Sequence, residues 1–398
     1  MPWFCFWDDH CLSGLLASLT MILFGGYVLT HLSRLFSPTE AAAISVGKTL
    51  IFALYFLFFY DMKTIMNTPD GCMYTSQMLC HYPYWGYAYT CRIAARLLGG
   101  FYASPVAFNT LLSVFIALLC AKVAGPLMQW KVRRTRWFFL FCCFHPEMFV
   151  WSSMYALKDT YVCACITTVM YCIWQICNKK LIFPIVFIKV AARAVLYFRE
   201  YVVSYMASSI GLWVAVLFVR RLKYIGALFA AVCALETISP ALRFYDSTLA
   251  TFNAYGNLAE FFLRRGGEPF SLGYLEILLG AWLQLWGAHS LKNMPPLVVL
   301  YNLATIPLLP IGLYLFVREN RHRDFAYYFL LFFCIVVAGF FVYTVIAVSP
   351  RHRFQVFFAT TLFQFLAFQW LYRNVKAKIH AIRERRGKEL PAPTAVPL

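Results

Sequence analysis

Charged residues are scarce in this sequence: Asp, Glu, Lys and Arg make up 13% of its 398 residues, whereas a soluble domain has about 25%. Acidic residues are the scarcest, at 17 against 35 Lys and Arg. Hydrophobic residues reach 62%, and they include 39 Phe, 25 Tyr and 11 Trp. One soluble core cannot bury so much apolar side chain. The composition therefore excludes a soluble enzyme, a disordered chain and a small disulfide-stapled domain, and it predicts a polytopic membrane protein.

Two short signals are also missing. The N-terminus lacks the basic region of a cleavable signal peptide and carries Asp8, Asp9 and His10 instead. No Asn-x-Ser/Thr sequon occurs, which favours a bacterial origin. The formal net charge of +18 belongs to a chain without a long soluble basic domain. We therefore attribute the charge to membrane orientation and to contact with anionic membrane lipids, and we expect no nucleic-acid partner.

The positions of the 14 cysteines are not typical of a disulfide framework, and their spacings are not typical of a zinc site. Most of them lie inside apolar runs, where Cys behaves as a small hydrophobic residue. Neither Cys142-Cys143 nor Cys163-Ala164-Cys165 has the ligand spacing of a zinc ribbon. Only Cys72, Cys80 and Cys91 fall in a loop-like stretch, and the sequence leaves open whether they form a disulfide.

Apolar windows of about 20 residues predict an all-α integral membrane protein with about eleven transmembrane helices. The predicted spans are 12–32, 42–60, 103–125, 137–156, 160–177, 181–197, 203–220, 224–240, 296–317, 325–348 and 354–373. The segment 271–290 is also apolar. A twelfth span there would place basic loops on opposite sides of the membrane, so we expect a re-entrant or interfacial helix on the external face, where Trp282 and Trp286 suit an interface.

Basic loops predict the orientation of these spans. The basic clusters are Lys122–Arg136, Asn178–Lys180, Arg220–Lys223, Arg318–Arg323 and the tail from Arg373 to Lys388. With eleven alternating spans, all five are cytoplasmic and the N-terminus is external. We therefore expect one transmembrane domain over 1–373, a basic cytoplasmic tail over 374–398, and two long external segments, 61–102 and 241–295, that cap a cavity.

Ionisable side chains near membrane depth are the candidate functional residues, because burying them is costly. On the predicted topology they gather near the external face. The candidate catalytic carboxylates are Asp70 and Asp159, as general bases or as metal ligands. The candidate ligands of an anionic substrate are Tyr74, Lys158, Arg193, Arg199, Arg243, Arg351, His352 and Arg353. Arginine suits phosphate because its planar fork donates two parallel hydrogen bonds.

Each of these candidate residues also has an interpretation in which it stabilises the structure and takes no part in function. Arg193 and Arg199 flank a span and can extend to lipid headgroups. Lys158 and Asp159 can form a local ion pair at a helix start, where Asp159 stabilises the N-terminus. Asp70, in Thr-Pro-Asp-Gly, is typical of a turn.

Two further motifs also have such a structural interpretation. Because Pro350 disfavours helix in the residue before it, we expect the next helix to start near Arg351, with an outward-facing first turn where Arg351 and Arg353 bind an anion. The segment Arg351–Arg353 can instead be an interfacial anchor. Inside the predicted span 137–156, Pro146 is expected to kink the helix, and Glu147 then needs a partner, which is typical of a satisfied buried carboxyl.

Three segments resemble bacterial multispanning glycosyltransferases of the GT-C superfamily. The run from His145 to Asp159 has a Pro followed by Trp-Ser and then Leu-Lys-Asp, as at the start of a helix in that superfamily. Asp70-Gly-Cys-Met-Tyr74 is similar to its first external loop, where an acidic residue precedes a Tyr. Ser349–Phe354 is similar to the Arg-Tyr-Arg stretch that opens its last helix.

The resemblance implies a GT-C-like enzyme of the bacterial inner membrane. Its donor would be a sugar on a polyprenyl phosphate or diphosphate, and its acceptor a glycan or lipid at the external face. Asp70 first, and Asp159 second, would deprotonate the acceptor, with inversion at the anomeric carbon. A divalent metal such as Mg or Mn is compatible with this chemistry but not required by the sequence.

Two alternatives stay open. O-antigen polymerases and ligases share a similar architecture and would use Arg351, His352 and Arg353 without a metal. A transporter or flippase of lipid-linked glycans would favour internal symmetry and charges at the bilayer midplane. We find no internal repeat, and the predicted charges lie near one face, so the sequence favours the enzyme.

Overall fold

The computed structural model describes residues 10–54, 86–99, 104–153, 158–219, 300–301, 304–305, 307–344 and 350–389. Within these ranges every regular element is a helix, which confirms the predicted all-α fold. Four helices are long and apolar enough to cross a membrane: Leu12–Leu32, Ser104–Leu127, Asp159–Cys177 and Arg353–Ile382. The predicted span 224–240 and the segment 271–290 lie outside the described residues.

The described helices follow the predicted spans along most of the chain. The first group comprises α1 (His10–Leu32), α2 (Pro38–Leu54), α4 (Gly86–Leu97), α5 (Ser104–Leu127), α6 (Val132–Cys143), α7 (Pro146–Ser153) and α8 (Asp159–Cys177). The second group comprises α9 (Ile182–Phe198), α10 (Glu200–Val219), α14 (Leu308–Glu319), α15 (Arg323–Thr344), the 3-10 helix η3 (Pro350–Val356) and α16 (Phe357–Glu389).

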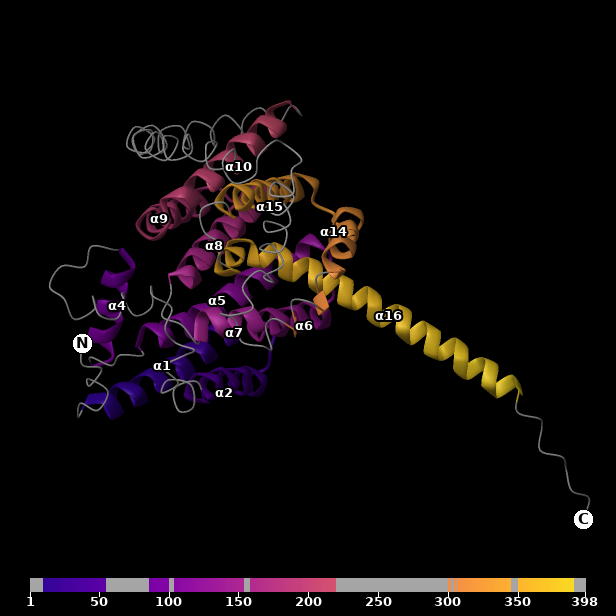
Figure 1. Cartoon of the computed structure of the whole chain (residues 1–398), viewed down its shortest axis with the longest axis horizontal. Coiled ribbons are helices and arrows are strands. Elements are labelled where there is room, and N and C mark those ends of the chain that lie inside the picture. The colour runs from indigo at the N-terminus through magenta and orange to yellow at the C-terminus, as the bar shows by residue number, and fades with distance from the viewer. Residues whose placement is uncertain are drawn as a thin grey trace, which may run out of the picture.

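Helix α5 forms the centre of the bundle. It packs against α1, α6, α7 and α8, and it buries most of its residues. Helices α1 and α2 lie at one edge, and α9, α10 and α15 lie at the opposite edge beyond α8 (Figure 1). The outer helix α1 exposes Leu12, Leu16 and Phe24. Such exposed apolar side chains are expected where a helix faces lipid.

Three of the predicted basic clusters lie at one end of the bundle, which we call the basic end. Arg136 at the start of α6 pairs with Glu40 at the start of α2. The backbone N–H of Arg321 donates to the carbonyl of Leu127 at the end of α5, over 3.3 Å. His322 stacks edge-on against Trp174 near the end of α8. The turns α5–α6, α8–α9 and α14–α15 therefore share one face, as the orientation argument requires.

The start of α2 shows how this end is held by local polar contacts. Glu40 accepts a hydrogen bond from the backbone N–H of Ser37 at 2.8 Å, and the Ser37 hydroxyl accepts one from the Glu40 N–H at 3.3 Å. This reciprocal capping satisfies two backbone donors that the helix leaves free. Hydrogen bonds from Ser37, together with the nearby Arg136 charge, hold the pKa of the Glu40 carboxyl below its usual range.

The predicted single span 137–156 is wrong, because two separate helices occupy it. Helix α6 ends at Cys143, and α7 begins at Pro146. Proline has no N–H to donate and restricts the residue before it, so Pro146 starts a new helix rather than kinking an old one. At 1.5 Å per residue, α6 carries the chain about 18 Å inward from the basic end. At the break, His145 is buried in the bundle, whereas Phe144 is 39% exposed.

The last span also begins differently from the prediction. We expected an α-helix starting near Arg351. Instead, Pro350–Val356 forms a 3-10 helix, and α16 starts at Phe357. Helix α16 then continues without a break to Glu389. The predicted boundary between the membrane domain and the tail, at residue 373, falls inside this helix.

Gly312 allows α14 to lie directly on α16. A Cβ atom at this position would lie 1.9 Å from the Phe363 carbonyl oxygen and 2.6 Å from its Cα atom. Backbone atoms cannot move aside as a flexible side chain can, so only glycine permits this contact.

We expect Gly312→Leu to separate the two helices and to lower the free energy of unfolding by roughly 1–3 kcal/mol or more. Gly211→Ala in α10 is the matched control, because a Cβ atom at that position would meet nothing within 4 Å. Replacing a helical glycine there should be neutral or stabilise the protein by up to about 1 kcal/mol. Thermal unfolding in detergent compares the two, and equal effects would contradict the close-contact argument.

Candidate functional site

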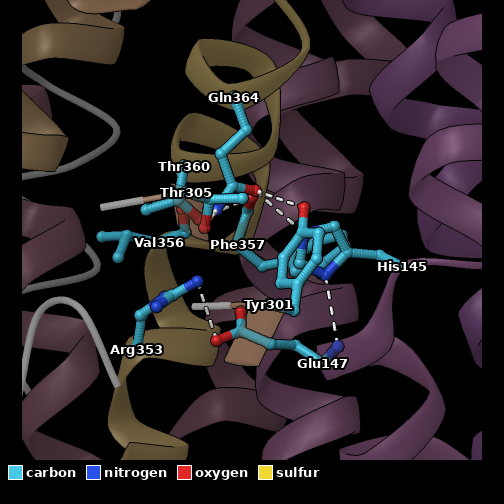
Figure 2. Close-up of polar contacts among 9 residues, drawn as sticks. All are labelled: His145, Glu147, Tyr301, Thr305, Arg353, Val356, Phe357, Thr360 and Gln364. Carbon is cyan, nitrogen blue, oxygen red and sulfur yellow. Dashed lines mark hydrogen bonds and ion pairs between the residues drawn. The ribbon is translucent and has the colours of Figure 1, made fainter. Parts of the chain in front are cut away.

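The break between α6 and α7 carries a buried polar network. His145 lies at the break, and its Nε2 atom is 2.9 Å from Gln364 Oε1 and 2.9 Å from the Tyr301 hydroxyl. Tyr301 also donates to Gln364 Oε1 at 3.2 Å, and Gln364 Nε2 donates to the Thr305 hydroxyl at 3.1 Å. Figure 2 shows these side chains converging between α16, the α7 start and the segment before α14. His145, Thr305 and Gln364 are almost fully buried.

The contacts of His145 determine where its ring proton lies. The backbone N–H of Glu147 donates to His145 Nδ1 at 3.2 Å, so Nδ1 is the acceptor. A neutral imidazole has one donor and one acceptor nitrogen, so Nε2 carries the proton and donates toward Gln364 and Tyr301. Phe141, Tyr301 and Phe357 enclose the ring edge to face, with centroids 4.9–5.5 Å away. This apolar enclosure favours the neutral ring.

A buried ion pair lies next to this network. Arg353 Nη2 is 2.8 Å from Glu147 Oε1, and both residues are 1% exposed. Glu147 comes from the first turn of α7, where the positive end of the helix dipole also stabilises its carboxylate. Arg353 comes from η3, a segment far from α7 along the chain. The structural interpretation of Glu147, a buried carboxyl with a partner, is confirmed.

A second buried ion pair joins Asp159 to Arg199. Arg199 Nη2 is 2.6 Å from Asp159 Oδ1, and the two side chains are 5% and 1% exposed respectively. Asp159 is the first residue of α8, and Arg199 lies in the one-residue break between α9 and α10. Because η3 packs against α8, the segments that carry the two ion pairs are neighbours. Asp159 therefore pairs with a distant arginine, which differs from the predicted local pair with Lys158.

Lys48 is a buried cation that we did not predict from the sequence. It is 1% exposed on α2, donates to the Ser113 hydroxyl at 2.8 Å and lies 5.5 Å over the Phe144 ring. No carboxylate of the described residues forms an ion pair with it. Lys48 thus borders the same helix break from the side of α2 and α5. A lysine inside an apolar run was the signal that could have found it.

The structure brings some of the predicted site residues together and separates others. Arg193 lies on the exposed face of α9, with Val190 and Tyr197, and not with the buried Arg199. Arg193 is therefore separate from the buried ion pair of Arg199, and its predicted role in anion binding stays a prediction. Lys158 lies half-buried directly before α8.

Other predicted residues have no described side chain. Asp70, Tyr74 and Arg243 lie outside the described residues. Arg351 and His352 belong to the backbone of η3, but of these three neighbours only Arg353 has a described side chain. We predicted that Arg353 lies in an outward-facing first helical turn. That placement is wrong, because its guanidinium is buried against Glu147.

The described cysteines are free thiols, and most of them are buried in the helices. Cys91 is buried as a free thiol in α4, and Cys142, Cys143 and Cys163 are buried free thiols as well. Cys72 and Cys80 lie outside the described residues. Within the part of the chain that the structure describes, no group of three or more His, Cys, Asp or Glu side chains is placed to hold a metal ion.

The arrangement offers two kinds of chemistry. Arg199 and Arg353 are guanidinium groups already desolvated in an apolar bundle, where an anion such as phosphate binds more strongly than in water. Asp159 and Glu147 are carboxylates within reach of those arginines and can accept a proton once the ion pair opens. Tyr301, Thr305 and Gln364 were missed from the sequence, since a lone hydroxyl or amide in an apolar run has no pattern of its own.

Comparison of this chain with protein-family models, curated proteins and solved structures finds no match in any of the three.

Proposed function

We propose that this protein is a membrane glycosyltransferase that moves a sugar from a polyprenyl-phosphate or polyprenyl-diphosphate carrier to a glycan or lipid acceptor. The observation that supports it best is the pair of buried arginine–carboxylate contacts, Asp159–Arg199 and Glu147–Arg353. Ionised groups in the interior of a membrane-crossing bundle are costly and mark substrate sites. Both carboxylates and Arg353 also fall on the segments that resemble the GT-C superfamily.

In this proposal the arginines receive the carrier phosphate. Arg199 or Arg353 exchanges its carboxylate for the phosphate of the lipid and stabilises the negative charge that develops on the leaving group, and such electrostatic stabilisation usually contributes most to catalysis. The released carboxylate becomes free to act as a base. Asp159 retains its proposed role of deprotonating the acceptor hydroxyl, and Glu147 joins it as a candidate. The role of Asp70 as the base remains a proposal that rests on the sequence resemblance alone.

The proposed topology follows the sequence argument. Eleven membrane crossings, with the broken pair α6 and α7 counted together as one crossing, an external N-terminus and a cytoplasmic tail in a bacterial inner membrane would put the basic end in the cytoplasm. The ion pairs would then lie toward the external half of the membrane, since Asp159 begins α8 at the end opposite its basic turn. A divalent metal is compatible with this proposal but is not required by it.

The test uses the purified full chain and two matched lipids, a polyprenyl phosphate and the polyprenol of the same length. We expect the phosphate lipid to raise the midpoint of thermal unfolding, because a ligand at 100 times its Kd stabilises by about 2.7 kcal/mol. The polyprenol should have little effect. Transfer of labelled sugar from the polyprenyl-phosphate donor is the functional readout. Equal responses to the two lipids would contradict the proposal.

A transporter of lipid-linked glycans is the second candidate, and one observation favours it. Transporters place substrate sites at broken helices near the bilayer midplane, and α6 and α7 break at His145 with Lys48, Glu147 and Arg353 beside the break. In proteoliposomes a transporter moves the labelled lipid-linked sugar across the bilayer without consuming it. An enzyme releases the polyprenyl phosphate.

A further inference from the structure

Helix α16 has a second half that the proposed function does not use. From Leu371 the helix runs on to Glu389, and Figure 1 shows this part of α16 extending away from the rest of the bundle. Between these residues the sequence has seven Lys and Arg against two Glu. From Tyr372 onward the helix is about 26 Å long at 1.5 Å per residue. Its composition is therefore that of a strongly basic surface helix.

The described part of this segment is amphipathic. Tyr372, Val375, Ile379 and Ile382 recur at spacings of three and four residues, which places them on one stripe of the helix. They are 68%, 46%, 45% and 53% exposed, so no described residue covers the stripe. Exposed basic side chains, including Arg373, Lys376 and Lys378, lie beside it. An apolar stripe of this kind stays in water only at a free-energy cost, so it indicates an apolar partner surface.

The position of the segment points to the bilayer surface. Exposed aromatic residues lie close to the basic turns on three helices: Trp137 on α6, Tyr314 on α14, and Trp370 on α16. Such side chains gather at the level of lipid headgroups. Trp370 directly precedes the basic segment, so Lys376 and Lys378 begin where the headgroups would be. A tilted helix leaving a membrane leans over the headgroups on one side, within reach of the stripe.

We propose that the segment Leu371–Glu389 binds anionic phospholipid headgroups at the surface of the protein's own membrane. The first residues of the stripe, Tyr372 and Val375, enter the boundary between headgroups and acyl chains, and the Lys and Arg that follow lean over the lipid phosphates and pair with them. Charge complementarity excludes a second copy of the same helix, whose excess positive charge would repel it. An acidic protein would also match the charge, but it would have to find the segment by diffusion, whereas the lipid surface is already beside it.

Hydrogen exchange of the full chain in lipid nanodiscs tests this proposal. One preparation contains only zwitterionic phosphatidylcholine, and the other contains phosphatidylglycerol as about a third of its lipids. We expect amides in 371–389 to exchange roughly ten-fold more slowly in the anionic discs, an effect that one or two Lys or Arg at an anionic surface supply. Raising the salt to about 1 M shortens the Debye length to about 3 Å and should restore fast exchange.

Two variants separate the charges from the stripe. Lys376→Gln together with Lys378→Gln should reduce the difference between the two discs, with the other five Lys and Arg of the segment keeping the rest. Val375→Ser together with Ile379→Ser should raise exchange in both discs. Lys179→Gln with Lys180→Gln, in the α8–α9 turn, is the matched control and should leave 371–389 unchanged. Exchange that does not depend on lipid charge overturns the proposal and would favour an acidic protein partner. A lipid effect of undiminished size in Lys376→Gln/Lys378→Gln also overturns it.

Discussion

Substituting Glu147 or Arg353 alone should lower the free energy of unfolding by roughly 3–5 kcal/mol, because each single change leaves a buried charge without its partner. We propose Glu147→Leu and Arg353→Met, which keep the side-chain volume approximately. The double variant should be more stable than either single variant, since apolar side chains of similar size often replace a buried ion pair at little cost. Unfolding of the purified protein in mixed micelles measures all four proteins of this cycle.

The exposed pair Glu40–Arg136 is the matched control. Its nitrogen and oxygen atoms are 3.4 Å apart, and the side chains of Arg136 and Glu40 are 39% and 46% exposed. A solvent-exposed pair contributes about 0–1 kcal/mol, so Glu40→Gln and Arg136→Gln should change stability little. If the Glu147 and Arg353 variants behave like this control, the ion pair is solvated and the burial argument is wrong.

Replacing Asp159 by Asn should reduce donor-dependent turnover by roughly 10²–10⁴, the contribution of a general base. Asn keeps the size of the side chain and removes both the charge and the ability to accept a proton. It also leaves the buried Arg199 without its partner, so turnover is compared at equal amounts of folded protein. Binding of the polyprenyl phosphate should persist, because Arg199 no longer has a carboxylate that competes for it. The expected signature is therefore lost turnover with retained lipid binding.

This signature distinguishes the base from a merely structural carboxylate. If Asp159 only holds Arg199 in place, Asp159→Asn should weaken phosphate binding and turnover together. Arg199→Gln provides the complementary measurement and should weaken binding of the phosphate lipid but not of the polyprenol. The exposed Glu40→Gln variant should keep both activities. Full turnover in Asp159→Asn would remove Asp159 from the mechanism and leave Glu147 and Asp70 as the carboxylates to test.

The two experiments together separate the stability of the site from its chemistry. The Glu147–Arg353 variants measure what the buried pair contributes to the free energy of unfolding. The Asp159 variant measures what a carboxylate contributes to donor-dependent turnover. The two pairs lie on neighbouring segments, because η3 packs against α8, so we expect their effects on stability to be coupled rather than additive.

The class of the protein and the positions of most helices could be predicted from the sequence. Apolar length sets where a helix can cross a membrane, so α1, α5, α8 and α9 match their predicted spans closely. The clustering of the basic turns at one end could also be predicted, because the rule that orients spans acts on loop charge alone. A distortion at Pro146 was expected, but the structure has a complete break between two helices where we predicted a kink in one.

The partners of the charged residues could not be predicted in this way. Spacing along the chain showed that Asp159 and Glu147 were unusual, but Arg199 and Arg353 reach them from segments that pack only in three dimensions. Tyr301, Thr305 and Gln364 could not be predicted for the same reason. Lys48 was not predicted either, although a lysine in an apolar run is a signal of a functional or buried charge.

Composition and apolar length therefore determined by themselves that the described chain is all-helical and has helices long and apolar enough to cross a membrane, because each depends on residues that are local in sequence. Only the tertiary structure decided that Arg353 turns inward to Glu147 rather than outward to solvent, and that Arg199 rather than Lys158 meets Asp159. The physical reason is that a buried charge is stable only beside an opposite one, and which opposite charge lies within reach depends on how distant helices pack.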